Sequence, residues 1–146
     1  MKISIASDHG GYVLKEAVKK HLIEKGIEVE DFGTDSLASC DYPDFGKPAA
    51  EAVADGKVDK GILICTTGIG MSMLANKIKG IRAALCADTV SARLTREHND
   101  ANILVMGAGI VGEILALSIV DKLLNTEFSN EEKHIRRINK IAKAEE

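Results

Sequence analysis

The sequence predicts an α/β fold in three layers, with a five-stranded parallel sheet between helices. Three observations lead to this prediction. Short apolar runs alternate with helical patterns along the chain, 45% of its residues are hydrophobic, and 146 residues can bury a sizeable core. Such alternation is typical of a parallel sheet covered by helices on both faces. Because no linker, repeat or low-complexity tract interrupts it, we predict a single domain over residues 1–146.

Five apolar segments are the predicted strands: Lys2–Ala6, Glu28–Phe32, Lys60–Cys65, Ile81–Cys86 and Ile103–Met106. The helical patterns between them and after the last strand are Tyr12–Lys25, Gly46–Asp55, Met71–Lys79, Thr89–His98 and Glu113–Leu124. Each strand is followed by a helical stretch, so the connections are βαβ crossovers, which are right-handed in nearly all proteins.

The stretch from Asn130 to Glu146 predicts an extra C-terminal helix. Ile135, Ile138 and Ile141 form one apolar stripe, and no further strand follows for the helix to cover. Two interpretations remain open. The helix is either a solvated element of its own domain, or an arm laid on a partner subunit that brings basic residues to a shared site.

Composition and charge exclude several classes of protein. Only 3% of the residues are aromatic and the net charge is -3, which argues against a nucleic-acid-binding surface. The apolar stretch at Met1–Asp8 is too short for a signal peptide, and Ile103–Val120 is interrupted by glycines and Glu113. The three cysteines form no CxxC pair, so neither a disulfide framework nor a zinc knuckle is predicted. We therefore expect a protein of the reducing cytoplasm.

Three loops rich in potentially catalytic side chains are expected at one edge of the sheet, because open parallel sheets bind ligands beyond the carboxyl ends of their strands. They are Ser7–Gly11, Cys65–Ser72 and Arg96–Asp100. His9 and His98 fall in the first and last of them, where a neutral imidazole could shuttle a proton.

The loop that begins at Cys65 is the most informative. A thiol at the end of a strand, facing the amides of a glycine-containing loop and the start of a helix, is favoured as a thiolate. Cys65 is therefore a candidate base, and the loop amides could form an anion cradle. The alternative is a buried structural cysteine, the interpretation that suits Cys40 and Cys86.

Rival motifs are weaker. A cysteine-dependent phosphatase loop needs an arginine at the sixth position after the cysteine, where this chain has Met71, and a Walker loop needs a lysine. Gly107–Gly112 spells GxGxxG, but no strand follows it to supply the acidic residue of a dinucleotide site. His, Asp and Cys residues show no regular ligand spacing, so we predict neither a metal nor a cofactor.

Several stretches together resemble the type B ribose-5-phosphate isomerases, part of a wider family that includes galactose-6-phosphate and allose-6-phosphate isomerases. They are Ser7–Gly11, Asp41–Pro43, Gly61–Gly70, Ala75–Lys77, Gly80–Ala83 and His98–Asn102. The resemblance covers nearly the whole chain. It implies a Rossmann-like or flavodoxin-like sandwich with strand order 2-1-3-4-5, and a homodimer with shared sites that could pair further into a dimer of dimers.

The reaction implied by the resemblance is the interconversion of ribose 5-phosphate and ribulose 5-phosphate without a cofactor. Cys65 would remove the C2 proton of the open-chain aldose and return it at C1. The amides from Thr66 to Gly70 and the Thr67 hydroxyl would stabilise the enediolate, and His98 would open the furanose ring. The implied substrate-binding residues are Asp8, His9, Tyr42, Thr66, Gly68, Ile69, Gly70, Ser72, Asn99, Lys133, His134, Arg136 and Arg137.

Two departures from the family pattern concern the phosphate. Gly109 and Lys133 stand where many relatives carry arginine, and lysine cannot reproduce a bidentate guanidinium contact. Two outcomes remain open: Gly109 leaves space for a longer sugar, or Lys133 or Arg136 reaches into the vacancy and restores the phosphate contact. The alternatives are therefore an isomerase of six-carbon sugars or sugar phosphates of the allose/psicose type, and a sugar-phosphate sensor without catalysis. The pair of Cys65 and His98 favours the enzyme, because a sensor needs no proton shuttle.

Overall fold

The computed structural model describes residues 1–146 and contains one parallel sheet in the order β2-β1-β3-β5-β4. Its strands are β1 (Lys2–Ser7), β2 (Glu28–Asp31), β3 (Lys60–Cys65), β4 (Ala83–Leu85) and β5 (Ile103–Gly107). The central strand β3 pairs with β1 and β5, so the carboxyl ends of these three strands are neighbours.

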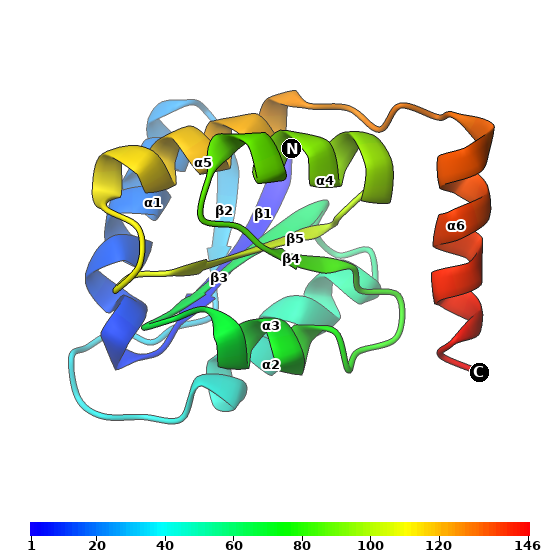
Figure 1. Ribbon diagram of the computed structural model, residues 1–146. Helices are drawn as coiled ribbons and strands as arrows, with labels where there is room; N and C mark the ends of the chain where they lie inside the picture. Colours follow the sequence, from blue (N-terminus) through cyan, green and yellow to red (C-terminus); the bar gives the residue numbers. More distant parts are fainter.

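Helices cover both faces of the sheet (Figure 1). On one face lie α1 (Tyr12–Glu24), α4 (Thr89–Asn99) and α5 (Glu113–Asn125), and on the other α2 (Tyr42–Ala54) and α3 (Ile69–Ala75). This three-layer arrangement confirms the predicted fold class.

Alternation along the strands explains why both faces are apolar. In β3, Ile62 and Ile64 face the α1, α4 and α5 layer, whereas Leu63 and Cys65 face the α2 and α3 layer. Successive side chains of a strand point to opposite faces, so a strand between two helical layers must be apolar throughout.

The strand order implied by the family resemblance was wrong at one edge, because β5 and β4 exchange places. Every residue of β5 is buried, whereas β4 has only three residues and its Leu85 is 43% exposed. A strand that is apolar on both faces gains most from an interior position, and a short strand exposes few unpaired backbone groups at an edge.

The bounds of α2 and α3 differ most from those predicted. Helix α2 begins at Tyr42 rather than at Gly46, with Pro43 in its first turn, where a missing N–H costs no hydrogen bond. Helix α3 runs from Ile69 to Ala75 rather than from Met71 to Lys79, so it starts within the loop that follows Cys65.

The last helix, α6 (Glu132–Lys143), stands apart from the sandwich beside the end of α4 (Figure 1). Ile135 and Ile141 are 41% and 50% exposed, so much of its apolar stripe has no partner within the chain. No helix of the structure combines the length and the apolar character needed to cross a membrane.

Candidate active site

Three loops meet around the carboxyl end of β3. The amide of Gly109, after β5, donates to the Thr66 carbonyl at 2.8 Å, and that of Ala108 donates to the Cys65 carbonyl at 2.9 Å. On the other side, after β1, Gly10 packs so closely on Thr66 that a Cβ there would overlap the threonine hydroxyl. The loop after β3 is therefore enclosed by its two neighbours, as the order of the strands requires.

Cys65 is 5% exposed, and its Sγ accepts a hydrogen bond of 3.2 Å from the Gly68 amide. Gly68 has a φ of +79°, a left-handed conformation that folds the loop back onto the sulfur and precedes α3. The Gly68 N–H is therefore aimed at the Cys65 sulfur from the start of α3. Burial raises the pKa of the Cys86 thiol to about 11, assisted by the charge of Asp88.

Two of the amides between Thr66 and Gly70 are bonded within the loop itself. The Gly68 amide binds Cys65, and the Ile69 amide donates to Thr67 Oγ1 at 3.2 Å. The Thr67 hydroxyl thus accepts a bond from its own loop, which leaves its O–H free to donate. Ser72 Oγ donates to the Ile69 carbonyl at 3.2 Å within the first turn of α3, which leaves its oxygen free to accept.

The loop after β1 presents His9 as a donor. The Cys40 amide donates to His9 Nδ1 at 3.2 Å, so a neutral His9 carries its proton on Nε2. Asp8 is 7% exposed and accepts a bond from the Gly11 amide through Oδ1, which caps the 3-10 helix His9–Gly11. Cys40 is half-buried beside His9, so the structural interpretation suits Cys86 better than Cys40.

Tyr42 joins the same edge from the start of α2. Its ring lies against Gly70, where an added Cβ would stand 2.9 Å from Tyr42 Cε1. Any side chain at position 70 would displace the tyrosine, so glycine is needed for this contact.

The predicted site residues of α4 and α6 are not at this edge, and the expectation that His98 shares an edge with His9 was wrong. Helix α4 starts beyond the carboxyl end of β4 and returns antiparallel to the strands, ending just before β5 begins. Asn102, directly after α4, accepts a bond from the Gly61 amide at the start of β3. Cys65 lies four residues further along β3, or about 13 Å at ~3.3 Å per residue.

His98 instead stacks on His134 of α6, with ring centroids 4.5 Å apart. This end of the molecule gathers the remaining predicted residues: Asn99, Lys133, His134, Arg136 and Arg137. Arg136 binds the Glu132 carboxylate at 2.8 Å and 2.9 Å. One chain therefore carries the predicted site as two halves at opposite ends of the sheet.

Comparison with known proteins decides the family. The sequence profile described as Ribose/Galactose Isomerase matches residues 3–141. The chain belongs to the ribose/galactose isomerase family. It is 46% identical to ribose-5-phosphate isomerase B of Escherichia coli over 145 residues, covering 99% of this chain and 97% of the relative.

Solved structures of this isomerase family have the same fold. Ribose-5-phosphate isomerase B of Clostridium thermocellum superimposes with a TM-score of 0.97 at 54% identity, covering 99% of this chain and 97% of the other. The Mycoplasma genitalium ribose-5-phosphate isomerase B, solved with bound ribulose-5-phosphate, gives a TM-score of 0.94 at 42% identity, with coverages of 99% and 95%.

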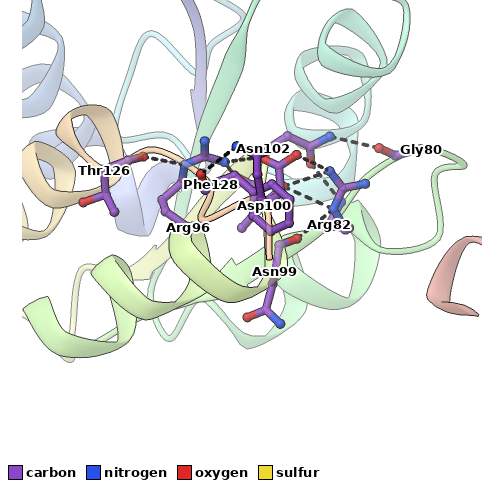
Figure 2. Close-up of polar contacts among 10 residues, drawn as sticks. Gly80, Arg82, Arg96, Asn99, Asp100, Asn102, Thr126 and Phe128 are labelled. Atoms are coloured by element: carbon purple, nitrogen blue, oxygen red, sulfur yellow. Dashed lines mark hydrogen bonds and ion pairs between the residues drawn. The ribbon is translucent and has the colours of Figure 1, made fainter. Parts of the chain in front are cut away.

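A polar cluster at the end of α4 was not assigned a role from the sequence. Figure 2 shows Arg82 and Arg96 on either side of Asp100, with Asn102 beside them. In this isomerase Arg82, Asp100 and Asn102 fall within two of the stretches that resemble the family, Gly80–Ala83 and His98–Asn102, and Arg96 lies two residues before the second. Their contacts are mostly with backbone carbonyls, which no residue pattern reveals in advance.

Proposed function

We propose that this chain interconverts ribose 5-phosphate and ribulose 5-phosphate through an enediolate, with Cys65 as the base and without a cofactor. The observation that carries the proposal is Cys65 at the carboxyl end of β3, nearly buried and hydrogen-bonded through sulfur to the Gly68 amide. The close relationship of the chain to proteins named ribose-5-phosphate isomerase B supports the proposal further.

In the proposed mechanism the Cys65 thiolate removes the C2 proton of the open-chain aldose and returns it at C1, while a second proton passes from the C2 hydroxyl to the C1 oxygen. The developing oxyanion needs donors already in place, since donors that must reorganise stabilise a transition state less. The free O–H of Thr67 and the Nε2–H of His9 are suited to this task. Tyr42 and the backbone of Gly70 would bound the sugar on the α2 side.

We further propose that two copies of the chain share their sites. His98, which opens the furanose ring in this mechanism, cannot reach Cys65 of its own chain across about 13 Å of strand. A second copy could supply His98, Asn99 and Arg137 to the Cys65 edge, and the exposed Ile135 and Ile141 of α6 would then be covered. In this assembly α6 is the arm on a partner subunit rather than a solvated helix.

The free cysteines fit a cytoplasmic enzyme, because thiols persist where the environment is reducing. We therefore place the proposed isomerase in the cytoplasm, with a sugar phosphate as its small-molecule partner.

The activity is tested by following ketose absorbance after addition of ribose 5-phosphate, with allose 6-phosphate and allose in parallel. The proposal predicts the highest kcat/KM for ribose 5-phosphate. A preference for a six-carbon substrate would establish the alternative isomerase, and binding of all three without turnover would establish a sensor.

The shared site is tested with mixed dimers of Cys65→Ala and His98→Asn chains, isolated through two different affinity tags. In a symmetric dimer one site then keeps both groups, so about half of the wild-type activity should return. Mixed dimers as inactive as the two parents would contradict sharing.

A further inference from the structure

Two arginines close on the end of α4 directly beyond His98 (Figure 2). Arg82 Nε donates to the Asn99 carbonyl at 2.9 Å and to the Asp100 carbonyl at 3.1 Å, and its Nη2 donates to Asp100 O at 2.9 Å. Arg96 Nη1 donates to the Ala101 carbonyl at 2.8 Å. The last carbonyls of a helix have no partner within the helix, so these guanidinium groups supply the missing donors.

Asp100 makes the turn that ends α4. Its φ and ψ are both 46°, a left-handed conformation that is costly for a residue other than glycine. Its carboxylate lies between the two arginines, with Oδ1 2.7 Å from Arg96 Nη1 and Oδ2 3.4 Å from Arg82 Nη2. The arginines therefore stabilise both the carbonyls and the carboxylate of this turn.

The backbone of Arg82 is held as well as its side chain. Asn102 Oδ1 accepts a bond of 2.8 Å from the Arg82 amide, and Asn102 Nδ2 donates to the Gly80 carbonyl at 2.9 Å. The segment 80–82 and the end of α4 thus form one hydrogen-bonded unit.

We infer that Arg82 is a positioning residue, which fixes the end of α4 so that His98 and Asn99 are aligned for catalysis. The inference rests on the proposed function, in which these two residues complete the site of a second copy. Arg82 needs no contact with substrate, because its guanidinium is directed at the carbonyls of Asn99 and Asp100. A displacement of about 1 Å in a catalytic group can lower a rate ~10²-fold, so the alignment matters.

The test compares Arg82→Ala and Arg82→Lys with Arg93→Ala. Arg93 lies on α4, the helix whose end Arg82 contacts, but its guanidinium binds only the Glu97 carboxylate, at 3.0 Å and 3.1 Å. Loss of the forked contact to the carbonyls should lower kcat/KM for ribose 5-phosphate about tenfold to a hundredfold in Arg82→Ala. Arg82→Lys should lose most of this activity too, since lysine has no planar fork, whereas Arg93→Ala should stay within about twofold of wild type.

Mixed dimers then show to which half of the site Arg82 belongs. General misfolding of the Arg82→Ala chain would not depend on which variant it is paired with. Arg82→Ala paired with Cys65→Ala leaves one site with both halves intact, so about half of the wild-type activity should return. Arg82→Ala paired with His98→Asn damages the same half in both chains, so activity should stay at the level of the parents. If Arg82→Ala does not fold, Arg82→Lys is taken through the same pairings.

The inference is overturned if both Arg82 variants keep the wild-type kcat/KM. It is also overturned if activity returns in mixed dimers of Arg82→Ala with His98→Asn, or does not return in mixed dimers of Arg82→Ala with Cys65→Ala. Failure of the proposed function is recognised separately, because the experiments that test it use only Cys65→Ala and His98→Asn. Activity in the Cys65→Ala homodimer would reject Cys65 as the base, and inactive mixed dimers of Cys65→Ala with His98→Asn would reject the shared site together with this role of Arg82.

Discussion

The imidazole rings of His98 and His134 are stacked, with centroids 4.5 Å apart and planes inclined by 15°. This contact joins the end of α4 to the first turn of α6. Burial lowers the pKa of His134, as do the charges of His98, Lys133 and Arg137, while Glu131 acts in the opposite direction. The folded chain therefore favours a neutral His134.

This shift predicts that α6 detaches at acidic pH. Because the pKa of His134 is lower in the folded state, its contribution to stability is present above the ordinary histidine pKa of about 6.5 and is lost as the pH falls through the folded-state pKa. Hydrogen exchange of the α6 amides should accelerate, beyond its intrinsic pH dependence, between pH 7.5 and pH 5.5. His134→Phe should remove this extra change, whereas His21→Phe, in α1, should keep it. An unchanged profile in His134→Phe would refute the prediction.

Asp31→Asn should destabilise the chain strongly at neutral pH. Asp31 accepts bonds from the amines of Lys15 and Lys19 and from the Gly33 amide, and Lys15 is only 1% exposed. Burial alone would raise the pKa of Asp31, but these hydrogen bonds outweigh it and lower the pKa. The substitution leaves the buried Lys15 ammonium with only the more exposed Glu16 carboxylate, so the free energy of unfolding should fall by roughly 3 kcal/mol in urea titrations at pH 7.

The lowered pKa of Asp31 also predicts how the loss of stability in Asp31→Asn depends on pH. A lowered carboxyl pKa contributes stability above the unfolded value of about 3.9 that is lost below it. The difference in the free energy of unfolding between wild type and Asp31→Asn should therefore be smaller at pH 3 than at pH 7. Asp121→Asn, which removes a more exposed partner of His21 and Lys25, should cost no more than about 1 kcal/mol.

Arg137→Ala should raise KM for ribose 5-phosphate with little change in kcat. Arg137 forms no ion pair within the chain, unlike Arg136, so its guanidinium is available to a phosphate. A charge-assisted hydrogen bond contributes about 1.5–3 kcal/mol, or roughly tenfold to a hundredfold in KM. Lys140→Ala, on the same helix, is the control and should leave KM within about twofold. Equal effects of the two substitutions would mean that only the overall charge of α6 matters.

Gly109 lies against the Cys65 loop, and the space expected there for a longer sugar stays a prediction. A Cβ at this position would stand 3.1 Å from the Thr66 carbonyl oxygen and 3.3 Å from Thr66 Cγ2. Gly109→Ala should therefore push on the Cys65 loop and lower kcat/KM, whereas Gly112→Ala, which has open space, should not. Gly109→Arg should have a lower KM than Gly109→Ala if the guanidinium reaches the phosphate. Equal KM values in these two variants would show that it does not.

The layers of the fold and the Cys65 loop were predictable because their signals are contiguous in the sequence. Alternating apolar segments define the sheet, and the stretch from Cys65 to Gly70 carries its own turn and its own thiol. The order of β4 and β5 was not predictable from proximity in the chain. It follows from which strand is long and apolar enough for an interior place.

The position of His98 was predicted incorrectly, although the reason lies in the topology. A helix that starts at the carboxyl edge of a parallel sheet must return to the amino edge before the next strand, so its last residues lie far from the loops at its start. The hydrogen bonds of Arg82 were beyond prediction, because they end on the backbone carbonyls of Asn99 and Asp100.

The central claim is that Cys65 transfers the proton, and the kcat of Cys65→Ala on ribose 5-phosphate tests it most directly. A positioned general base contributes about 10²–10⁴-fold, so kcat should fall by at least ~10²-fold while the Kd for ribulose 5-phosphate stays within a few-fold of wild type. A variant that keeps more than about a tenth of the wild-type kcat would contradict the account, because a base cannot be removed at so small a cost.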